Sequence, residues 1–170
     1  MRRTVLLPFV ALALCAGARP CAATAPDTHA FSVHDLLAMD RLSEPAVAPD
    51  GRRIAFTVRE TDLDANRGRT DIWICDADGS SLRRLTTDAA SDFNPRWDDR
   101  GRVWFLSTRS GSAQVWMIDP TGGEARRITD LPLDVANLVL VPQAGAMLFS
   151  LEVYPGATIA ETVAHDAELA

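Results

Sequence analysis

The sequence predicts an all-β fold built from repeated antiparallel sheets, and three observations support that prediction. A segment with the pattern of strand, turn and strand occurs at residues 71–86 and again at residues 114–129, a shift of 43 residues. The segments that precede each copy, 44–52 and 94–102, also correspond, at a shift of 50 residues. Short runs of β-branched and aromatic residues, separated by turn residues, fill both copies. A period of roughly 40–50 residues made of short strands is typical of a β-propeller blade, which buries its apolar face only against a neighbouring blade.

Residues 1–23 are predicted to be a signal peptide. They contain an arginine pair near the start and an apolar stretch at 5–14, and small residues follow at 22–25. The apolar stretch is too short to span a bilayer comfortably. We therefore expect cleavage between Ala23 and Ala25, export to the periplasm or the medium, and no membrane contact afterwards. The arginine pair leaves the choice between the general and the twin-arginine export route open.

Residues 24–42 are interpreted as a polar lead-in followed by a short helix over residues 31–40. Ser32 is the expected N-cap, and Asp35 stands three residues later, as in a capping box. An apolar stripe on this helix is expected to seal one face of a propeller. The stripe consists of Val33, Leu36, Leu37 and Met39.

Residues 43–154 are expected to form two full four-stranded blades and part of a third. Blade 1 covers residues 43–87, blade 2 covers 92–130, and the partial blade 3 covers 135–154. Blade 1 carries a longer loop than blade 2. In chain order, the other expected features are a strand at 54–58, the loop at about 61–70, and strands at 71–75, 82–85, 94–97, 103–108, 114–118, 125–128, 137–142 and 145–151.

Turn residues define the ends of these strands. Pro49-Asp50-Gly51 and Asp76-Ala77-Asp78-Gly79 are expected tight turns, since proline fixes one dihedral angle and glycine accepts a positive φ. Arginines on the outer strand of each blade, at 83–84 and 126–127, are expected to face solvent and to protect an edge strand from mispairing. The charged group at 98–100 is interpreted as a solvated turn.

The blade pattern ends at residue 154, and residues 155–170 are expected to form an insertion with a helix. Thr158 is its expected cap, with Glu161 three residues later. Two and a half blades cannot close a ring, because closed propellers have at least four blades. The chain is therefore expected to be a fragment, to assemble with other chains, or to form an open array with a sticky edge, and a fragment is the most economical interpretation.

Composition excludes several classes of function. The net charge is −6 and every basic residue is arginine, so no basic patch is expected for nucleic acid. After residue 23 the chain keeps one cysteine, Cys75, so that part has no internal disulfide. Cys75 lies in an apolar strand and is expected to be a small buried core residue.

The stretch from residue 31 to residue 86 resembles the amino-terminal start of bacterial exported serine peptidases of the prolyl oligopeptidase family. It is most similar to their acylaminoacyl-peptidase and dipeptidyl-aminopeptidase branch. The resemblance is carried by the helix and blade opening at 35–56, which contains Pro45 and Pro49-Asp50-Gly51, and it continues in Asp71-Ile72-Trp73 and in Arg83-Arg84-Leu85-Thr86. It covers most of residues 31–154. TolB-like periplasmic propellers share the blade pattern without the helix.

The resemblance implies a non-catalytic propeller that admits short peptides to an α/β-hydrolase active site absent from this chain. The nucleophile elbow of such a domain reads Gly-x-Ser-x-Gly, and the sequence has none. Gly79-Ser80-Ser81 and Gly111-Ser112-Ala113 lack the second glycine. We therefore expect no catalytic, cofactor-binding or metal-binding residues, and a peptide substrate only within a full-length peptidase.

Two other interpretations stay open from the sequence. A TolB-like propeller would act as a protein-binding module, with a protein partner or self-association through the open blade edge. A remnant that does not fold stably would have no function. The peptide preference and the total number of blades are not determined by the sequence.

Other polar and aromatic groups are interpreted structurally. The histidines are expected to be surface or helix-face residues, because none follows a strand end as a triad base would. Turn formation explains five aspartates better than calcium binding, because the glutamate of a calcium loop is absent downstream. The tryptophans recur at blade positions and are expected to pack between sheets. These residues are His29, His34 and His165; Asp62, Asp64, Asp71, Asp76 and Asp78; and Trp73, Trp97, Trp104 and Trp116.

Overall fold

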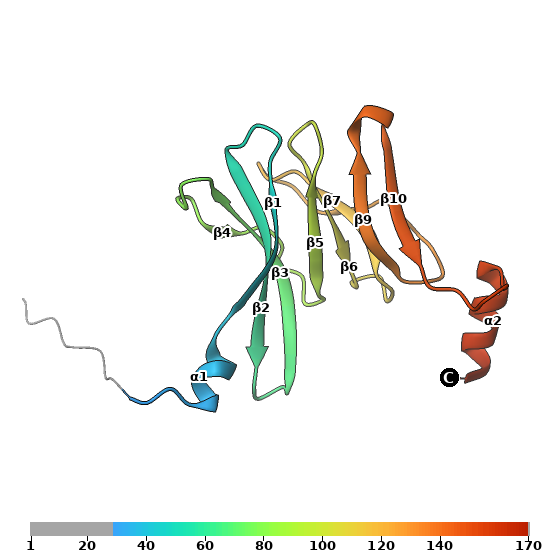
Figure 1. The fold of residues 1–170 in the computed structure, drawn as a ribbon, viewed down its shortest axis with the longest axis horizontal. Helices are drawn as coiled ribbons and strands as arrows, with labels where there is room; N and C mark the ends of the chain where they lie inside the picture. Colours follow the sequence, from blue (N-terminus) through green and yellow to red (C-terminus); the bar gives the residue numbers. More distant parts are fainter. Residues whose placement is uncertain (1–28, 170) are drawn as a thin grey trace, which may run out of the picture. The chain divides into compact units, whose positions relative to one another are not determined.

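Antiparallel strands dominate the part of the chain that the computed structural model describes, residues 29–169 (Figure 1). All of the helices and strands described lie in the unit that begins at Ser32. The predicted signal peptide, 1–23, and the start of the lead-in lie outside the described residues. No helix among the described residues is long and apolar enough to cross a membrane.

Within residues 29–169, ten strands form three separate antiparallel sheets, in each of which neighbouring strands are consecutive in the chain. We name these sheets blade 1, blade 2 and blade 3. The two four-stranded sheets and the third, two-stranded sheet confirm the predicted partial propeller. Blade 1 contains β1 (Arg41–Val47), β2 (Arg53–Asp62), β3 (Arg67–Asp76) and β4 (Arg83–Arg84); blade 2 contains β5 (Asp92–Trp97), β6 (Val103–Ser107), β7 (Gln114–Ile118) and β8 (Arg126–Arg127); blade 3 contains β9 (Val135–Val141) and β10 (Ala146–Leu151).

Strand register shows that blades 1 and 2 are structural repeats. Phe56 pairs with Trp73 in blade 1, and Phe105 pairs with Trp116 in blade 2. The second strands therefore correspond at a shift of 49 residues. The predicted shift of 50 holds only for the first strands, because the turn from Ala48 to the β2 strand is one residue longer than its counterpart in blade 2.

Two apolar clusters join neighbouring sheets. Between blades 1 and 2, Ala55, Ile72 and Ile74 pack with Val103 and Phe105, and all five side chains are buried. A second cluster joins blades 2 and 3. Its buried members are Leu106, Val115, Val135 and Leu138. Since one sheet cannot cover both of its own faces, these shared clusters hold the blades in succession.

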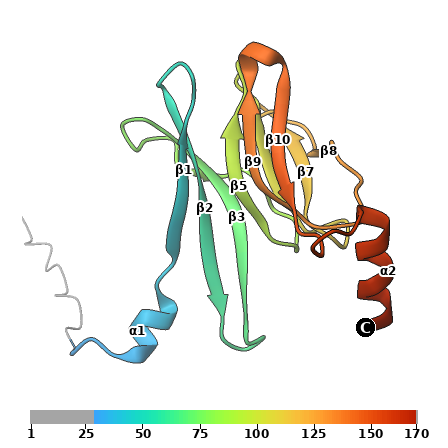
Figure 2. The same cartoon turned by 45° about the vertical axis from the view of Figure 1, so that its right-hand side comes forward.

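The first strand of each blade lies beside the first strand of the next, as Figures 1 and 2 show for β1, β5 and β9. Side chains connect these strands. Glu44 accepts hydrogen bonds from the backbone N–H of Asn94 at 2.8 Å and from its side-chain amide at 3.2 Å. Trp97 Nε1 donates to the Ala46 carbonyl at 2.9 Å, and Arg96 Nε donates to the Leu138 carbonyl at 3.0 Å.

The short helix α1 (Val33–Ala38) precedes blade 1 and confirms the predicted capping box. The Ser32 backbone N–H donates to the Asp35 carboxylate at 2.6 Å, and the Asp35 N–H donates to the Ser32 hydroxyl at 3.4 Å. The expectation that its apolar stripe seals a propeller face is wrong for the described chain. Val33, Leu36 and Met39 are exposed, because no sheet in the described chain lies over that side of the helix.

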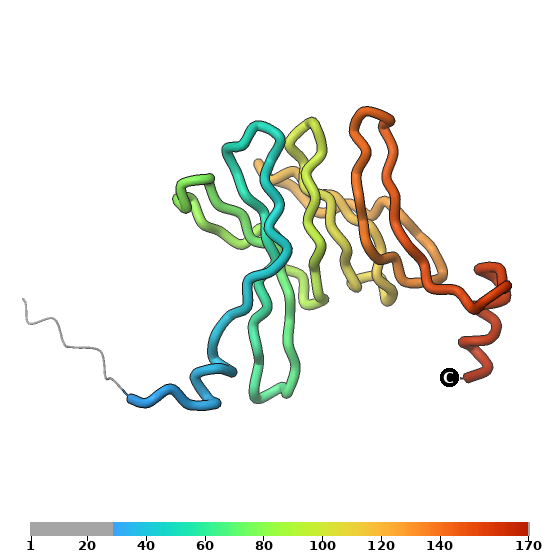
Figure 3. Tube along the Cα trace, in the orientation of Figure 1, coloured from blue at the N-terminus to red at the C-terminus, as the bar shows by residue number. Residues whose placement is uncertain are grey.

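The segment predicted as a long loop at about 61–70 is instead an extension of the β2–β3 hairpin (Figure 3). The pairing continues without interruption to Asp62 opposite Arg67, and four residues form the turn. Polar residues stand on both sides of this extension, because it runs beyond the part of blade 1 that a neighbouring sheet covers. For that reason it lacks the apolar alternation by which strands are predicted.

The helix α2 (Ile159–Leu169) follows blade 3, after the short 3-10 helix η1 (Pro142–Ala144) has joined its two strands (Figure 2). Its predicted cap is confirmed. The Thr158 N–H donates to the Glu161 carboxylate at 2.7 Å, and the Glu161 N–H donates to the Thr158 hydroxyl at 3.3 Å. The pKa of Glu161 lies below its usual value because the backbone N–H of Thr158, together with the Thr158 hydroxyl, stabilises the Glu161 carboxylate.

Candidate functional site

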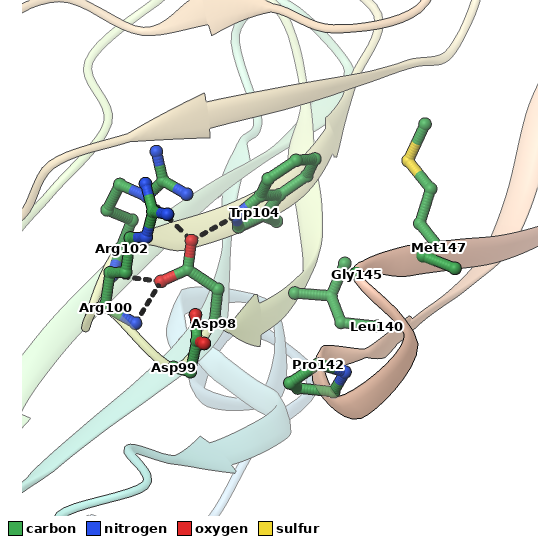
Figure 4. A pocket seen from close by; sticks show the side chains of 10 residues that line it. Asp98, Asp99, Arg100, Arg102, Trp104, Leu140, Pro142, Gly145 and Met147 are labelled. Carbon is green, nitrogen blue, oxygen red and sulfur yellow. Dashed lines mark hydrogen bonds and ion pairs between the residues drawn. The ribbon is translucent and has the colours of Figure 1, made fainter.

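A pocket of about 390 Å³ opens between blades 2 and 3 (Figure 4). One wall comes from the turn between β5 and β6, which supplies Asp98 and Arg102, and from Trp104 on β6. The opposite wall comes from blade 3, with Leu140 on β9 and Met147 on β10. The pocket therefore combines a charged turn with an apolar and aromatic lining.

Asp98 organises the charged wall of this pocket. Its carboxylate accepts hydrogen bonds from Trp104 Nε1 at 2.9 Å, from Arg102 Nε at 2.7 Å, and from the backbone N–H groups of Arg100 at 3.0 Å and Arg102 at 2.9 Å (Figure 4). Burial opposes ionisation of this carboxylate, but the bonds from Trp104 and Arg102 outweigh it and lower the pKa of Asp98.

The interpretation of residues 98–100 as a solvated turn is therefore wrong for Asp98, which is buried and fully engaged. The sequence indicates the burial of Asp98 only when blades 1 and 2 are compared. At a shift of 50, the corresponding residue of blade 1 is Ala48, which is also buried but carries no charge. Because the carboxylate already accepts four hydrogen bonds, it holds the turn in shape and is poorly placed to abstract a proton. The pocket is suited to binding, and chemistry would need groups from elsewhere.

Two further aspartates are completely buried beside arginines. Asp71 of β3 is bonded to Arg69 at 3.1 Å and to Arg84 of β4, and Asp92 of β5 is bonded to Arg109 at 2.6 Å. Asp71 is thus held inside blade 1 and does not form a turn. Of the two outer arginines of blade 1, Arg83 is exposed, as expected, whereas the expectation that Arg84 faces solvent is wrong. Arg84 neutralises the buried Asp71, because an unpaired charge there would be costly.

The other arginine of that pair, Arg83, donates a hydrogen bond from its guanidinium to the Pro120 carbonyl of blade 2. It connects the outer strand of blade 1, β4, to the turn between β7 and β8 of blade 2. In blade 2 the equivalent pair is exposed, as predicted, and Arg127 forms an ion pair with Asp130 at the surface.

The serines and histidines that were considered and set aside as nucleophiles and bases have other surroundings in the structure. Ser80 donates to Asp78 at 2.6 Å in a hairpin turn, and the Ser112 hydroxyl accepts from Gln114 at 3.0 Å. The ring of His165 lies 4.3 Å from that of Tyr154. His34 is exposed on α1 and His29 is exposed in the lead-in. The structure does not bring these serines and imidazoles together as a triad would require, and the expectation of no catalytic residues stays a prediction.

The aspartates considered for calcium serve local turns and ion pairs. Asp62 accepts from the backbone N–H of Ala65 at 2.9 Å, and Asp78 accepts from that of Ser80 at 2.9 Å. The hydroxyl and backbone N–H of Ser80 lower the pKa of Asp78. Within residues 29–169, no three His, Cys, Asp or Glu side chains are grouped closely enough to hold a metal ion.

The tryptophans differ in how far they are buried. Trp97 is buried between blades 1 and 2, as predicted, whereas Trp104 is half-buried and lines the pocket. Trp73 and Trp116 occupy equivalent register positions and are both half-buried. The guanidinium of Arg109 lies 4.8 Å from the Trp116 ring centre. Cys75, expected in the core, is also half-buried, because no sheet among the described residues lies against its side of blade 1.

Successive four-stranded meanders that share apolar clusters define this chain as a β-propeller protein. The family model of the TolB beta propeller domain matches residues 38–157. The chain therefore belongs to the TolB β-propeller domain family.

Curated relatives fall into two groups, peptidases and TolB proteins. The uncharacterized peptidase YuxL of Bacillus subtilis is 29% identical over 131 residues, which are 76% of this chain and 20% of that protein. Dipeptidyl-peptidase 5 of Porphyromonas endodontalis is 22% identical over 119 residues, 69% of this chain and 17% of that protein. The Tol-Pal system protein TolB of Anaeromyxobacter dehalogenans is 50% identical over 50 residues, 29% of this chain and 10% of that protein. The chain thus spans a fifth or less of the length of these relatives.

Solved structures show the same fold. A putative TolB from Agrobacterium tumefaciens matches 64% of this chain and 38% of its own, with a TM-score of 0.54 and 24% identity. An acylaminoacyl peptidase in complex with a chloromethyl ketone matches 64% of this chain and 17% of its own, with a TM-score of 0.53 and 18% identity. Both likenesses support the propeller fold.

Proposed function

We propose that the chain is the amino-terminal propeller part of an exported serine peptidase of the prolyl oligopeptidase family. In that setting the propeller would admit short peptides to a hydrolase active site and would take no part in the chemistry. The signal-peptide pattern of residues 1–23 supports export. The substrate would be a peptide, and only the complete peptidase would act on it.

The extent of the similarity carries this proposal. The match to a peptidase extends over 76% of the chain, whereas the match to TolB, although more identical, covers 29%. A capped helix also leads into the first strand of blade 1, in the order expected for the peptidases. The roles of Ser80, Ser112 and His165 described above support a non-catalytic part, because each of these side chains already has a neighbour unrelated to a triad.

A TolB-like protein-binding module is the second candidate. It is favoured by the 50-residue match and by the pocket between blades 2 and 3, which offers apolar and charged groups for binding. The two candidates differ in what the chain should accompany in the cell. A peptidase part should be found with a reactive serine, and a binding module should be found with other envelope proteins.

Activity-based labelling separates these candidates. An antibody raised against the chain would be used to capture its native form from the exported fraction of the source organism, and the captured material would be treated with a fluorophosphonate. We expect a labelled serine hydrolase, either in the same polypeptide or bound to it. The absence of labelling, with envelope proteins captured instead, would favour the binding module.

The 170-residue chain itself provides the matched control. Purified free of host peptidases, it should not cleave aminoacyl or dipeptidyl chromogenic substrates, and it should not react with the fluorophosphonate. Turnover that the fluorophosphonate abolishes would contradict the non-catalytic part of the proposal. Capture only from the cytoplasmic fraction would contradict export.

A further inference from the structure

The contact between blades 1 and 2 contains a buried tryptophan near the turn that ends the first strand. Trp97 is the last residue of β5, pairs with Val103, and lies in the apolar cluster that joins the two blades. The same cluster includes Ala48 and Ala55 of blade 1, and both are buried. The guanidinium of Arg53, also of blade 1, lies 5.0 Å from the centre of the Trp97 ring. Small residues of blade 1 thus make room for the indole, and an arginine of blade 1 covers it.

The contact between blades 2 and 3 has a smaller residue at the equivalent place. Leu140 pairs with Met147, and both side chains pack toward the cluster shared with blade 2. The counterpart of this pair in blade 2 is Trp97 with Val103, because each is the pair nearest the turn that packs toward the preceding blade. Leu140 and Met147 are only half-buried, whereas the two residues of blade 2 are buried. The pocket of about 390 Å³ lies at this place.

The pocket persists although blade 2 carries a large side chain here. Trp104 stands at the position of Ala55, at the shift of 49 residues that relates the second strands. Its Nε1 donates to Asp98 of its own blade at 2.9 Å, so the indole is held as one wall of the pocket (Figure 4). At the same shift Arg102 corresponds to Arg53, and it also lines the pocket. The pocket therefore keeps the covering arginine, gains an aromatic wall and lacks the ring between the blades.

We propose that this pocket binds an aromatic side chain of a peptide segment from a partner protein, with the ring seated between Trp104 and Leu140 and covered by Arg102. The occupant is aromatic because an aromatic ring fills the equivalent space between blades 1 and 2, and because contacts with a ring and a guanidinium add to the burial of apolar area. Asp99 and Arg100 line the same pocket and are exposed. A carboxylate acceptor and a guanidinium donor match the N–H and C=O groups of a peptide backbone, which favours a peptide over a free ring.

Such a peptide site goes beyond the proposed function. Both of its walls come from blades 2 and 3, so it would serve a peptidase propeller and a TolB-like binding module alike. Its test measures binding at the pocket and does not involve serine reactivity. The outcome is therefore independent of the fluorophosphonate labelling described above.

NMR of the full chain with ¹³C-labelled methionine methyl groups tests the site. Met147 lines the pocket, whereas Met39 is exposed at the end of α1 and serves as an internal control. The probes are two tripeptides with blocked ends, glycine-tryptophan-glycine and glycine-leucine-glycine. The tryptophan peptide should shift the Met147 methyl upfield in a saturable manner, because a ring seated beside the methyl group shields it. It should bind at least about threefold more tightly than the leucine peptide, because leucine offers no ring to the guanidinium.

Leu140→Trp would close the pocket from within. It places an indole at the position equivalent to Trp97, so the Met147 methyl should be shifted upfield before any peptide is added, and the tryptophan peptide should no longer bind. Leu63→Trp is the matched control, because it makes the same substitution in the exposed turn beyond β2. This variant should bind the tryptophan peptide as wild type does.

Several results would overturn the proposal. The tryptophan peptide could leave the Met147 methyl unmoved or shift the Met39 methyl as far, or the leucine peptide could bind equally well. Tighter binding of free indole than of the tryptophan peptide would assign the pocket to a small aromatic molecule and overturn the peptide as occupant. Undiminished binding to a folded Leu140→Trp variant would place the peptide outside the pocket. The wild-type measurements decide between these outcomes even if Leu140→Trp fails to fold.

Discussion

Phe105 and Phe56 form a natural pair for testing how much a covered face contributes to stability. Both lie on the second strand of a blade, opposite a tryptophan of the third strand. Phe105 is 0% exposed and is enclosed between two sheets. Phe56 is 9% exposed and borders an open apolar groove of blade 1, which it lines together with Leu42 and Leu82. Truncation of a buried phenylalanine to alanine costs about 3–5 kcal/mol, and the cost grows with the cavity that cannot collapse.

We expect Phe105→Ala to fall at the upper end, about 5 kcal/mol, because both walls of its cavity are held by other packing. The guanidinium of Arg109, 5.6 Å from the ring centre, adds about 0.5–1 kcal/mol that is lost with the ring. Phe56→Ala should cost about 3 kcal/mol or less, because water enters the space and side chains at the open groove can relax.

Urea unfolding followed by fluorescence would measure both values. Equal costs for the two variants would refute the reasoning, because the difference rests entirely on one face being covered. A cost below about 1 kcal/mol for Phe105→Ala would show that blades 1 and 2 do not pack as described.

Three further predictions concern polar groups. Asp98→Asn should lower the free energy of unfolding by about 1–3 kcal/mol at neutral pH, because it weakens charge-assisted hydrogen bonds. Folding lowers the pKa of Asp98, so its carboxylate contributes fully to the free energy of unfolding above pH 3.8, its ordinary pKa. This contribution is lost as the pH falls through the lower pKa of the folded protein. The free energies of unfolding of wild type and Asp98→Asn should therefore converge in acid. Glu161→Ala should speed amide hydrogen exchange at Thr158, and this difference should vanish in acid, where Glu161 is protonated in wild type too. Thr86→Val should cost about 1–3 kcal/mol in urea unfolding, because the buried N–H of Ile72 loses the hydroxyl that accepts its hydrogen bond at 3.0 Å.

The repeat in the sequence was sufficient to predict the sheets, because it marks the same physical environment twice. The strand expected at 114–118 coincides with β7 (Gln114–Ile118), since a buried strand alternates its side chains between two apolar clusters. Both capping boxes were predictable as well, because a cap depends on residues only three positions apart. The extended hairpin was missed, since strands exposed on both faces have no apolar alternation.

The features of the candidate site were less predictable because they depend on contacts between blades. Nothing local in the sequence distinguishes the buried Asp98 from its exposed neighbour Asp99; the difference comes from Trp104, six residues away, which donates to the carboxylate of Asp98. The same holds for Arg84, whose partner Asp71 lies on another strand. The exposure of α1 could not be foreseen either, since it depends on what covers the helix.

The first strands of the three blades, β1, β5 and β9, share a backbone feature that affects the cooperativity of unfolding. Glu44, Asn94 and Asn137 each adopt a left-handed conformation, with φ of 53°, 57° and 54°. A residue other than glycine in this region costs about 1 kcal/mol, and asparagine tolerates it better than glutamate does. At position 44 the molecule accepts that strain and gains a carboxylate that reaches Asn94 in the next blade.

In a linear array of repeats, stability divides into the intrinsic stability of each unit and the coupling between neighbours. Glu44 lowers the intrinsic stability of blade 1 through its strained backbone. It also strengthens the coupling between blades 1 and 2 through its hydrogen bonds to Asn94. A glycine at this position would relax blade 1 while weakening its link to blade 2, so the protein could gain local stability and lose the single, all-or-none unfolding transition. Glutamate at position 44 thus favours the joint unfolding of blades 1 and 2 over the melting of each blade by itself.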